Sequence, residues 1–138
     1  MPFKRVLCAV DFSRDSLEGF RLAIEIARLH CGALHLFHVI EGQPAVPAEV
    51  TLEILNRANT AIEGLVASAQ SSLEGLTFTS EIASGLAFRE IVDKAREWRA
   101  DLVALGSKGH NLLEEIVIGG TAAAVLREAP CSVLVVRP

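Results

Sequence analysis

Five short apolar runs, separated by longer stretches of helical periodicity, constrain the fold of this chain more than any other feature. Residues 6–10 are too short and too uniformly apolar for a helix with a polar face, so we expect a strand buried on both sides. Residues 102–105 are also expected to form an apolar strand. Residues 76–82 alternate apolar with polar side chains, which predicts an edge strand with one solvated face. The other two runs are residues 33–40 and 131–136.

Helices are expected between these runs, because apolar residues recur there at intervals of three and four. They cover residues 13–31, 49–72, 86–98 and 121–129, with Ser13 or Asp15 placed to cap the first. Strands that alternate with helices require a parallel sheet covered by helices on both faces. We therefore predict an α/β fold in which residues 1–138 form one domain, a doubly wound open sheet of five parallel strands. The pattern alone leaves the strand order open.

A ligand site is predicted at the carboxyl edge of this sheet, at the point where the strand order reverses. Two strand ends carry polar or glycine-rich residues: Asp11 to Ser13 follow the first strand, and Gly106 to Gly109 follow the fourth. We expect these two strands to be neighbours that flank the switch point. Asp11 is equally well placed to cap the first helix, and both roles remain open.

The last third of the chain places a strand, a glycine loop and a helix N-terminus in series. Gly106 and Gly109 follow the fourth strand, and Gly119 and Gly120 open an alanine-rich helix. Free backbone N–H groups at a helix start favour anions such as phosphate, and glycines permit positive φ and close approach of a ligand. The series therefore favours a nucleotide site. The alternative is that the glycines form plain turns, with Lys108 a solvated loop residue.

Composition excludes several other functions. The chain has 17 acidic and 13 basic residues, a net charge of −4 without charged blocks, so a nucleic-acid surface is not expected. No apolar run reaches membrane-spanning length and no secretory signal is visible, which predicts a cytoplasmic protein without a membrane partner. The three cysteines are expected to be free thiols. His35 and His38 lie three apart in a strand, on opposite faces, and cannot share a metal.

These strand and loop segments resemble the universal stress protein family along essentially the whole chain. "KRVLCAVDFS" resembles the opening strand of that family, "LFHVI" the second strand and "APCSVLVVRP" the closing strand. Gly106, Gly109 and Gly119 fit the glycine spacing of its ATP-binding pattern. The resemblance implies an adenine nucleotide alpha hydrolase-like fold with strand order 3-2-1-4-5.

The resemblance also implies specific roles for residues at the sheet edge. Asp11 would lie near adenine and ribose, and the backbone around Val10 and Val39 would receive the adenine. The phosphates of ATP, with or without Mg²⁺, would be held by the following residues: Gly106, Gly109, Gly119 and Gly120, with Lys108 as a charge partner. The family places Ser or Thr where this chain has Gly120, although Thr121 follows. Glu114 and Glu115 add negative charge to the loop and would oppose a polyphosphate that they faced.

Three functional hypotheses follow from these residues and from the resemblance. The first is a dimeric ATP-binding sensor or regulator in the stress response, with a homodimer formed through the apolar edge strand from Cys131 to Val136, as the family implies. The second is a dimeric interaction protein of the same family that binds no nucleotide. The third is a weak ATPase. No GxxxxGK[ST] loop, GxSxG elbow or Cys–His pair at metal spacing is present, so binding is favoured over catalysis.

Overall fold

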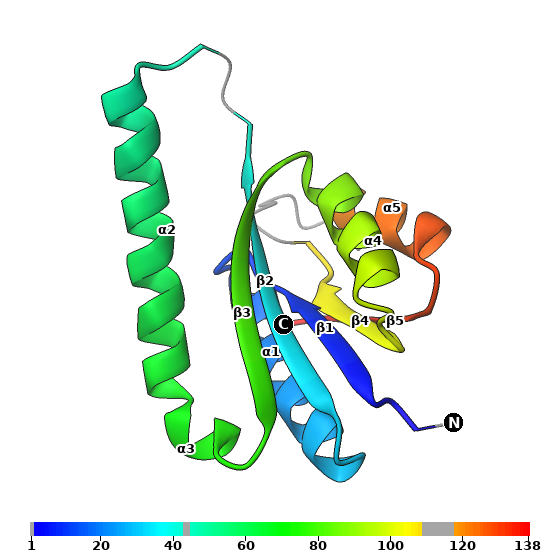
Figure 1. Ribbon diagram of the computed structural model, residues 1–138. Helices are drawn as coiled ribbons and strands as arrows, with labels where there is room; N and C mark the ends of the chain where they lie inside the picture. Colours follow the sequence, from blue (N-terminus) through cyan, green and yellow to red (C-terminus); the bar gives the residue numbers. More distant parts are fainter. Residues whose placement is uncertain (1, 43–44, 109–117) are drawn as a thin grey trace.

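The computed structural model describes residues 2–42, 45–108 and 118–138 (Figure 1). Strands and helices alternate along the chain. Their bounds are β1 (Arg5–Ala9), α1 (Arg14–Leu29), β2 (Ala33–Glu41), α2 (Ala48–Ser68), α3 (Gln70–Leu73), β3 (Thr77–Gly85), α4 (Ala87–Glu97), β4 (Leu102–Gly106), α5 (Gly120–Glu128) and β5 (Ser132–Val136).

The five strands form one parallel sheet in the order β3-β2-β1-β4-β5, which confirms the predicted fold and strand order. β1 pairs with β2 on one side and with β4 on the other, with Val6 opposite Leu102. The two strands with polar or glycine-rich ends are therefore neighbours, as expected. The strand order reverses between them, so the switch point lies at the carboxyl ends of β1 and β4.

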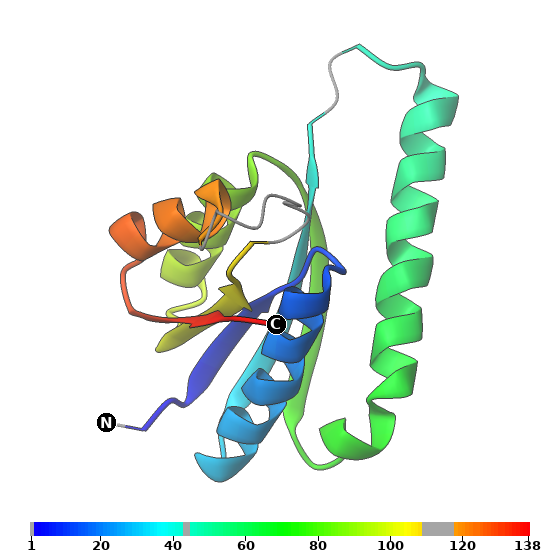
Figure 2. The ribbon, with the colours of Figure 1, turned by 180° about the vertical axis from the view of Figure 1, so that it is seen from behind.

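Two helical layers cover the sheet, α1 and α2 on one face and α4 and α5 on the other (Figures 1 and 2). β1 shows why both layers are needed. Val6 and Cys8 pack in the core cluster on the α1 side, whereas Leu7 and Ala9 pack in the cluster on the α4 side. Because successive side chains point to opposite faces, an uninterrupted apolar run fills both cores.

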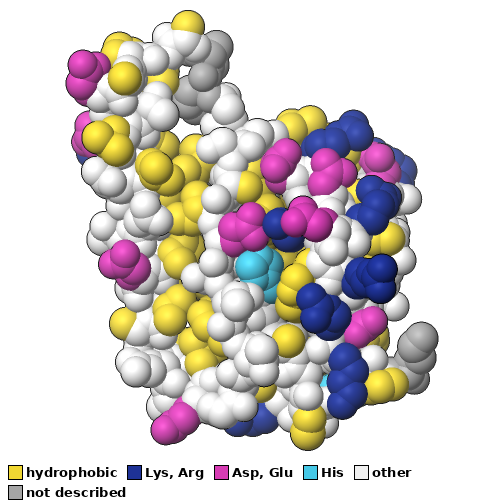
Figure 3. Space-filling model, in the orientation of Figure 1, with side chains coloured by type: hydrophobic (Ala, Val, Ile, Leu, Met, Phe, Trp, Pro, Cys, Tyr) yellow, Lys and Arg dark blue, Asp and Glu magenta, His cyan; other side chains and the backbone are white. Residues whose placement is uncertain are grey.

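The second helix differs from its predicted extent. A single long helix was expected over residues 49–72, but α2 ends at Ser68 and α3 forms a separate turn. At the break, the Ala69 backbone N–H donates to Leu65 and Val66 carbonyls, and the following turn buries Leu73. The apolar stripe continues through the break onto the same core, so periodicity alone does not reveal it. Figure 3 shows hydrophobic side chains gathered along this α2–β3 side of the molecule.

The edge strands are also slightly displaced from their predicted bounds. β3 begins at Thr77 and extends to Gly85 rather than residue 82, because it stays paired with β2 up to Glu41. β3 and β5 are the two edges of the sheet, as expected. Cys131 precedes β5, which begins at Ser132.

Candidate functional site

A cavity of about 690 Å³ lies at the carboxyl edge of the sheet, at the switch point. Its walls come from the ends of β1, β2 and β4, from α2 and from the start of α5. It brings together all the predicted site residues that the structure describes: Val10, Asp11, Val39, Gly106, Lys108, Gly119, Gly120 and Thr121. Gly109, Glu114 and Glu115 lie outside the described residues.

The backbone at the end of β1 is already engaged within the sheet. The Val10 N–H donates to the Phe37 carbonyl at 2.9 Å, and the Val10 carbonyl accepts from His38 Nδ1 at 2.7 Å. Alternate residues of a strand direct their N–H and C=O groups to the same side. Val39 therefore directs both groups toward the β1 side, as Phe37 does, but beyond the point where β1 ends. This makes Val39 better placed than Val10 to form backbone hydrogen bonds with a base.

Asp11 shapes the turn between β1 and α1. Its Oδ1 accepts from the Ser13 N–H at 3.0 Å and from the Ser13 hydroxyl, and its own N–H donates to Ser16 Oγ at 3.3 Å. Ser13 is the N-cap of α1 and its side chain accepts from the Ser16 N–H, whereas Asp11 precedes the cap and Asp15 lies within the first turn. Between them, Phe12 has a φ of 66° and its ring lies 4.9 Å from that of His38. A non-glycine residue in this region is typical of functional sites.

The glycines at the site are needed for close approach, not for positive φ. The expectation of positive φ was wrong for Gly106 and Gly119, because the described glycines with positive φ are Gly75 and Gly85. A Cβ on Gly106 would lie 2.7 Å from Asp15 Cγ. A Cβ on Gly119 would lie 3.2 Å from the Lys108 carbonyl oxygen. Both glycines therefore let neighbouring backbone pack tightly around the loop.

Gly120 lies in a different environment. An added Cβ would meet no other described atom within 4 Å, so the described neighbours leave room for the Ser or Thr side chain that the family implies there. α5 begins at this residue, and among the described residues no side chain caps it. Its first-turn N–H groups therefore lack intrahelical partners at the cavity wall, where Gly120, Thr121 and Ala122 lie. Such a helix start favours an anion.

Two parts of the site were missed by sequence reasoning. One is a wall from α2, where Ile54, Arg57, Ala58 and Ala61 line the cavity at the spacing of one helical face. The apolar stripe predicted for this helix includes Ile54 and Ala58, but periodicity cannot distinguish a core from a cavity wall. The other is Asp15, a buried carboxylate that accepts from the Lys108 N–H at 2.6 Å.

Comparison with known proteins settles the family. The model of the universal stress protein family matches residues 2–137. The chain belongs to that family. Universal stress protein MJ0531 of Methanocaldococcus jannaschii is 31% identical, over 98% of this chain and 82% of the relative. The solved structure of universal stress protein UspA from Lactobacillus plantarum is 28% identical, with a TM-score of 0.88, and each chain is 99% covered.

Two other solved universal stress proteins share the fold at 22% identity. One is described as a complex with cAMP, with a TM-score of 0.75 and coverage of 99% of this chain and 98% of the other. The second, from Archaeoglobus fulgidus, is described as a complex with dAMP, with a TM-score of 0.72 and 99% of each chain covered. The resemblance read from the strand segments and glycine spacing is thereby confirmed. No helix within the described residues is long and apolar enough to span a membrane.

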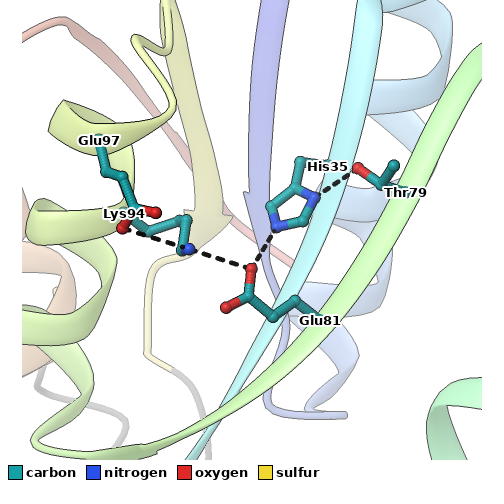
Figure 4. Close-up of polar contacts among 5 residues, drawn as sticks. All are labelled: His35, Thr79, Glu81, Lys94 and Glu97. Atoms are coloured by element: carbon teal, nitrogen blue, oxygen red, sulfur yellow. Dashed lines mark hydrogen bonds and ion pairs between the residues drawn. The ribbon is translucent and has the colours of Figure 1, made fainter.

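A second polar cluster of this universal stress protein lies outside the cavity, between β2, β3 and α4 (Figure 4). His35 Nδ1 contacts Thr79 Oγ1 at 2.5 Å and its Nε2 contacts Glu81 Oε1 at 3.0 Å, while Lys94 Nζ lies 3.1 Å from the same Glu81 oxygen. Burial acts to raise the pKa of Glu81, but hydrogen bonds from Lys94 and His35 outweigh it and lower that pKa. His38 lies instead against Phe12, so the predicted opposite placement of the two histidines is confirmed.

Proposed function

We propose that this universal stress protein binds ATP, or another adenine nucleotide, in the switch-point cavity. The observation that carries the proposal is the cavity itself, which is lined both by Val39, past the end of β1, and by the start of α5, where no described side chain caps the helix. An adenine base offers adjacent donor and acceptor groups that suit a strand backbone, and phosphate suits a helix N-terminus. The cAMP and dAMP complexes of proteins with the same fold support this choice of ligand class.

The described residues fit such a ligand from one end to the other. Asp11 and Val39 would contact the nucleoside, and Gly119, Gly120 and Thr121 would bind phosphate through backbone N–H groups and the Thr121 hydroxyl. The Lys108 backbone N–H is engaged by Asp15, so Lys108 would act through its ammonium group. No group of three or more metal-ligating side chains is found in the described part of the chain. Mg²⁺ usually keeps several waters and is bound together with substrate phosphates, so it would enter the site with ATP.

We further propose that the protein acts as a homodimeric sensor or regulator paired through β5. The Val136 carbonyl accepts from the Ser107 N–H, so Val136 faces β4. Val135 directs its backbone groups the opposite way, toward the outer edge. An apolar edge strand with outward N–H and C=O groups is suited to pairing with a second copy. The location in the cytoplasm stays a prediction.

Calorimetric titration of nucleotide-free protein with ATP and GTP tests the proposal. We expect saturable binding of ATP, weaker binding of GTP, and loss of ATP binding in Gly120→Leu, because Gly120 lines the cavity and an added Cβ there meets no other described atom within 4 Å. Gly64→Leu is the matched control, because Gly64 also has open space around it but lies on α2 away from the cavity lining. Absence of heat at millimolar ATP in wild-type protein would contradict the proposal and favour an interaction protein that binds no nucleotide.

A further inference from the structure

Asp15 links two parts of the molecule that are 93 residues apart in sequence. It lies in the first turn of α1 and is 3% exposed. Its Oδ1 accepts from Ser13 Oγ at 2.7 Å and from the Ser16 N–H at 3.1 Å, both within that turn. Its Oδ2 accepts from the Lys108 N–H at 2.6 Å and from Ser107 Oγ at 3.4 Å, beyond the end of β4. One carboxylate thus joins α1 to the start of the glycine loop.

Hydrogen-bond donors and the α1 dipole stabilise the buried carboxylate of Asp15. A carboxylate removed from water is tolerated when hydrogen-bond donors surround it, and the positive end of the α1 dipole favours negative charge in the first turn. A carboxylate that accepts from backbone N–H groups forms strong, short hydrogen bonds. The 2.6 Å contact therefore fixes the orientation of the Ser107–Lys108 peptide relative to α1.

Ser107 connects Asp15 to Gly119, at the far end of the loop. The Ser107 carbonyl accepts from the Gly119 N–H at 2.5 Å, and Gly119 is the N-cap of α5. Gly106 lacks a side chain at the place where the Asp15 carboxylate packs, since a Cβ there would lie 2.8 Å from Oδ2. Asp15 thus holds Ser107 and Lys108 directly, and Gly119 through Ser107.

We propose that Asp15 is the positioning residue for the phosphate end of the cavity, a role that rests on the proposed nucleotide-binding function. Asp15 is not part of the cavity lining, whereas Lys108 and Gly119 line the cavity. Asp15 therefore acts on the cavity through these two residues. The nucleoside end depends instead on Val39 and Asp11. Asp11 shares the Ser13 hydroxyl with Asp15, but its hydrogen bonds with the Ser13 N–H and Ser16 Oγ do not involve the Asp15 carboxylate. Loss of the carboxylate should therefore weaken binding of phosphate-bearing ligands and spare adenosine.

The test compares Asp15→Ala with Ala23→Gly, a control that weakens the same helix at a buried position outside the loop contacts. ATP and adenosine affinities are measured by calorimetry for both variants and wild type. We expect Asp15→Ala to lose about tenfold or more in ATP affinity, the effect of losing one charge-assisted hydrogen bond, with adenosine affinity unchanged within about twofold. Ala23→Gly should leave the ratio of the two affinities at its wild-type value.

A second readout needs no nucleotide. Amide hydrogen exchange of Lys108 and Gly119 should accelerate in Asp15→Ala but not in Ala23→Gly, while the Val103 amide within β4 stays protected in both. Equal weakening of ATP and adenosine, or unchanged exchange at Lys108, would overturn the positioning role. If wild-type protein binds neither ligand, the proposed function fails, and the exchange of Lys108 alone decides whether Asp15 positions the loop.

Discussion

The replacement Gly106→Ala tests why the first glycine of the loop is needed. An alanine Cβ would lie 2.7 Å from Asp15 Cγ and 2.7 Å from the Ser16 backbone nitrogen, closer than real Cβ contacts. Gly106 does not have a positive φ, so the cost comes from collision rather than from backbone conformation. The first turn of α1 must move away, and the hydrogen bond from the Lys108 N–H to Asp15 must lengthen or break.

The expected loss of stability follows from these two effects. Overpacking a close contact with one added methyl group costs about 1–3 kcal/mol. Loss of a hydrogen bond to a buried carboxylate adds about 1.5–3 kcal/mol. We therefore expect the free energy of unfolding to fall by roughly 3–5 kcal/mol. In a domain of this size, that corresponds to a fall in Tm of about 10–20 °C.

Thermal and denaturant unfolding followed by circular dichroism measure this change. Gly120→Ala is the matched control, because its Cβ meets no other atom of the described residues within 4 Å and a helical Gly→Ala change gains about 0.4–1 kcal/mol. In the double variant with Asp15→Ala, part of the collision and the hydrogen bond are already absent, so the two losses should not add, with a coupling of about 1 kcal/mol or more. A Gly106→Ala protein within about 1 kcal/mol of wild type, or strictly additive losses, would refute the close-approach argument.

Three other predictions concern regions outside the loop. Burial raises the pKa of the Cys8 thiol to about 12, whereas Cys31 is exposed. A disulfide-forming thiol reagent should therefore modify Cys31 in native protein and Cys8 only after unfolding. Rapid modification of Cys8 in a native Cys31→Ser variant would contradict the buried placement of Cys8. The pKa of Glu81 is lowered in the folded protein, so its stabilising effect is present above its unfolded pKa and is lost as pH falls through the folded value. Glu81→Gln should therefore lower Tm most near pH 7 and least near pH 3, and a pH-independent difference would argue against the ion pair with Lys94. Val135→Pro removes an outward N–H from β5 without removing a hydrogen bond to β4. The variant should be a monomer by light scattering, with the circular dichroism spectrum of the wild type. A dimer that persists would place the interface elsewhere.

The fold was predictable because the pattern of apolar and polar residues in a strand indicates whether one or both of its faces are buried. The uniform apolar run at residues 6–10 and the alternation at residues 76–82 distinguish a central strand from an edge strand, and β1 and β3 lie at those places. The polar end of β1 and the glycine-rich end of β4 likewise indicated neighbouring strands, which the sheet confirms. These features depend on local sequence, so they can be recognised from the residue pattern.

The parts that escaped prediction depend on contacts across the chain. Asp15 appeared as one of three candidate caps for α1, and only the fold reveals that its carboxylate reaches Lys108. The same contact explains Gly106, whose lack of a side chain the residue pattern linked to positive φ and to close approach of a ligand rather than of Asp15. The break at Ala69 was hidden because the apolar stripe continues across it.

The most direct test of nucleotide binding at the switch point is an amide NMR titration of nucleotide-free protein with ATP. We predict saturable chemical-shift changes at Val39 and at Gly119, Gly120 and Thr121, with the amides of β3 near Phe78 unaffected. Titration with adenosine should reproduce the changes at Val39 and omit most of those at the start of α5. Unchanged spectra at millimolar ATP, or changes confined to residues outside the cavity lining, would contradict the assignment of this cavity as a nucleotide site.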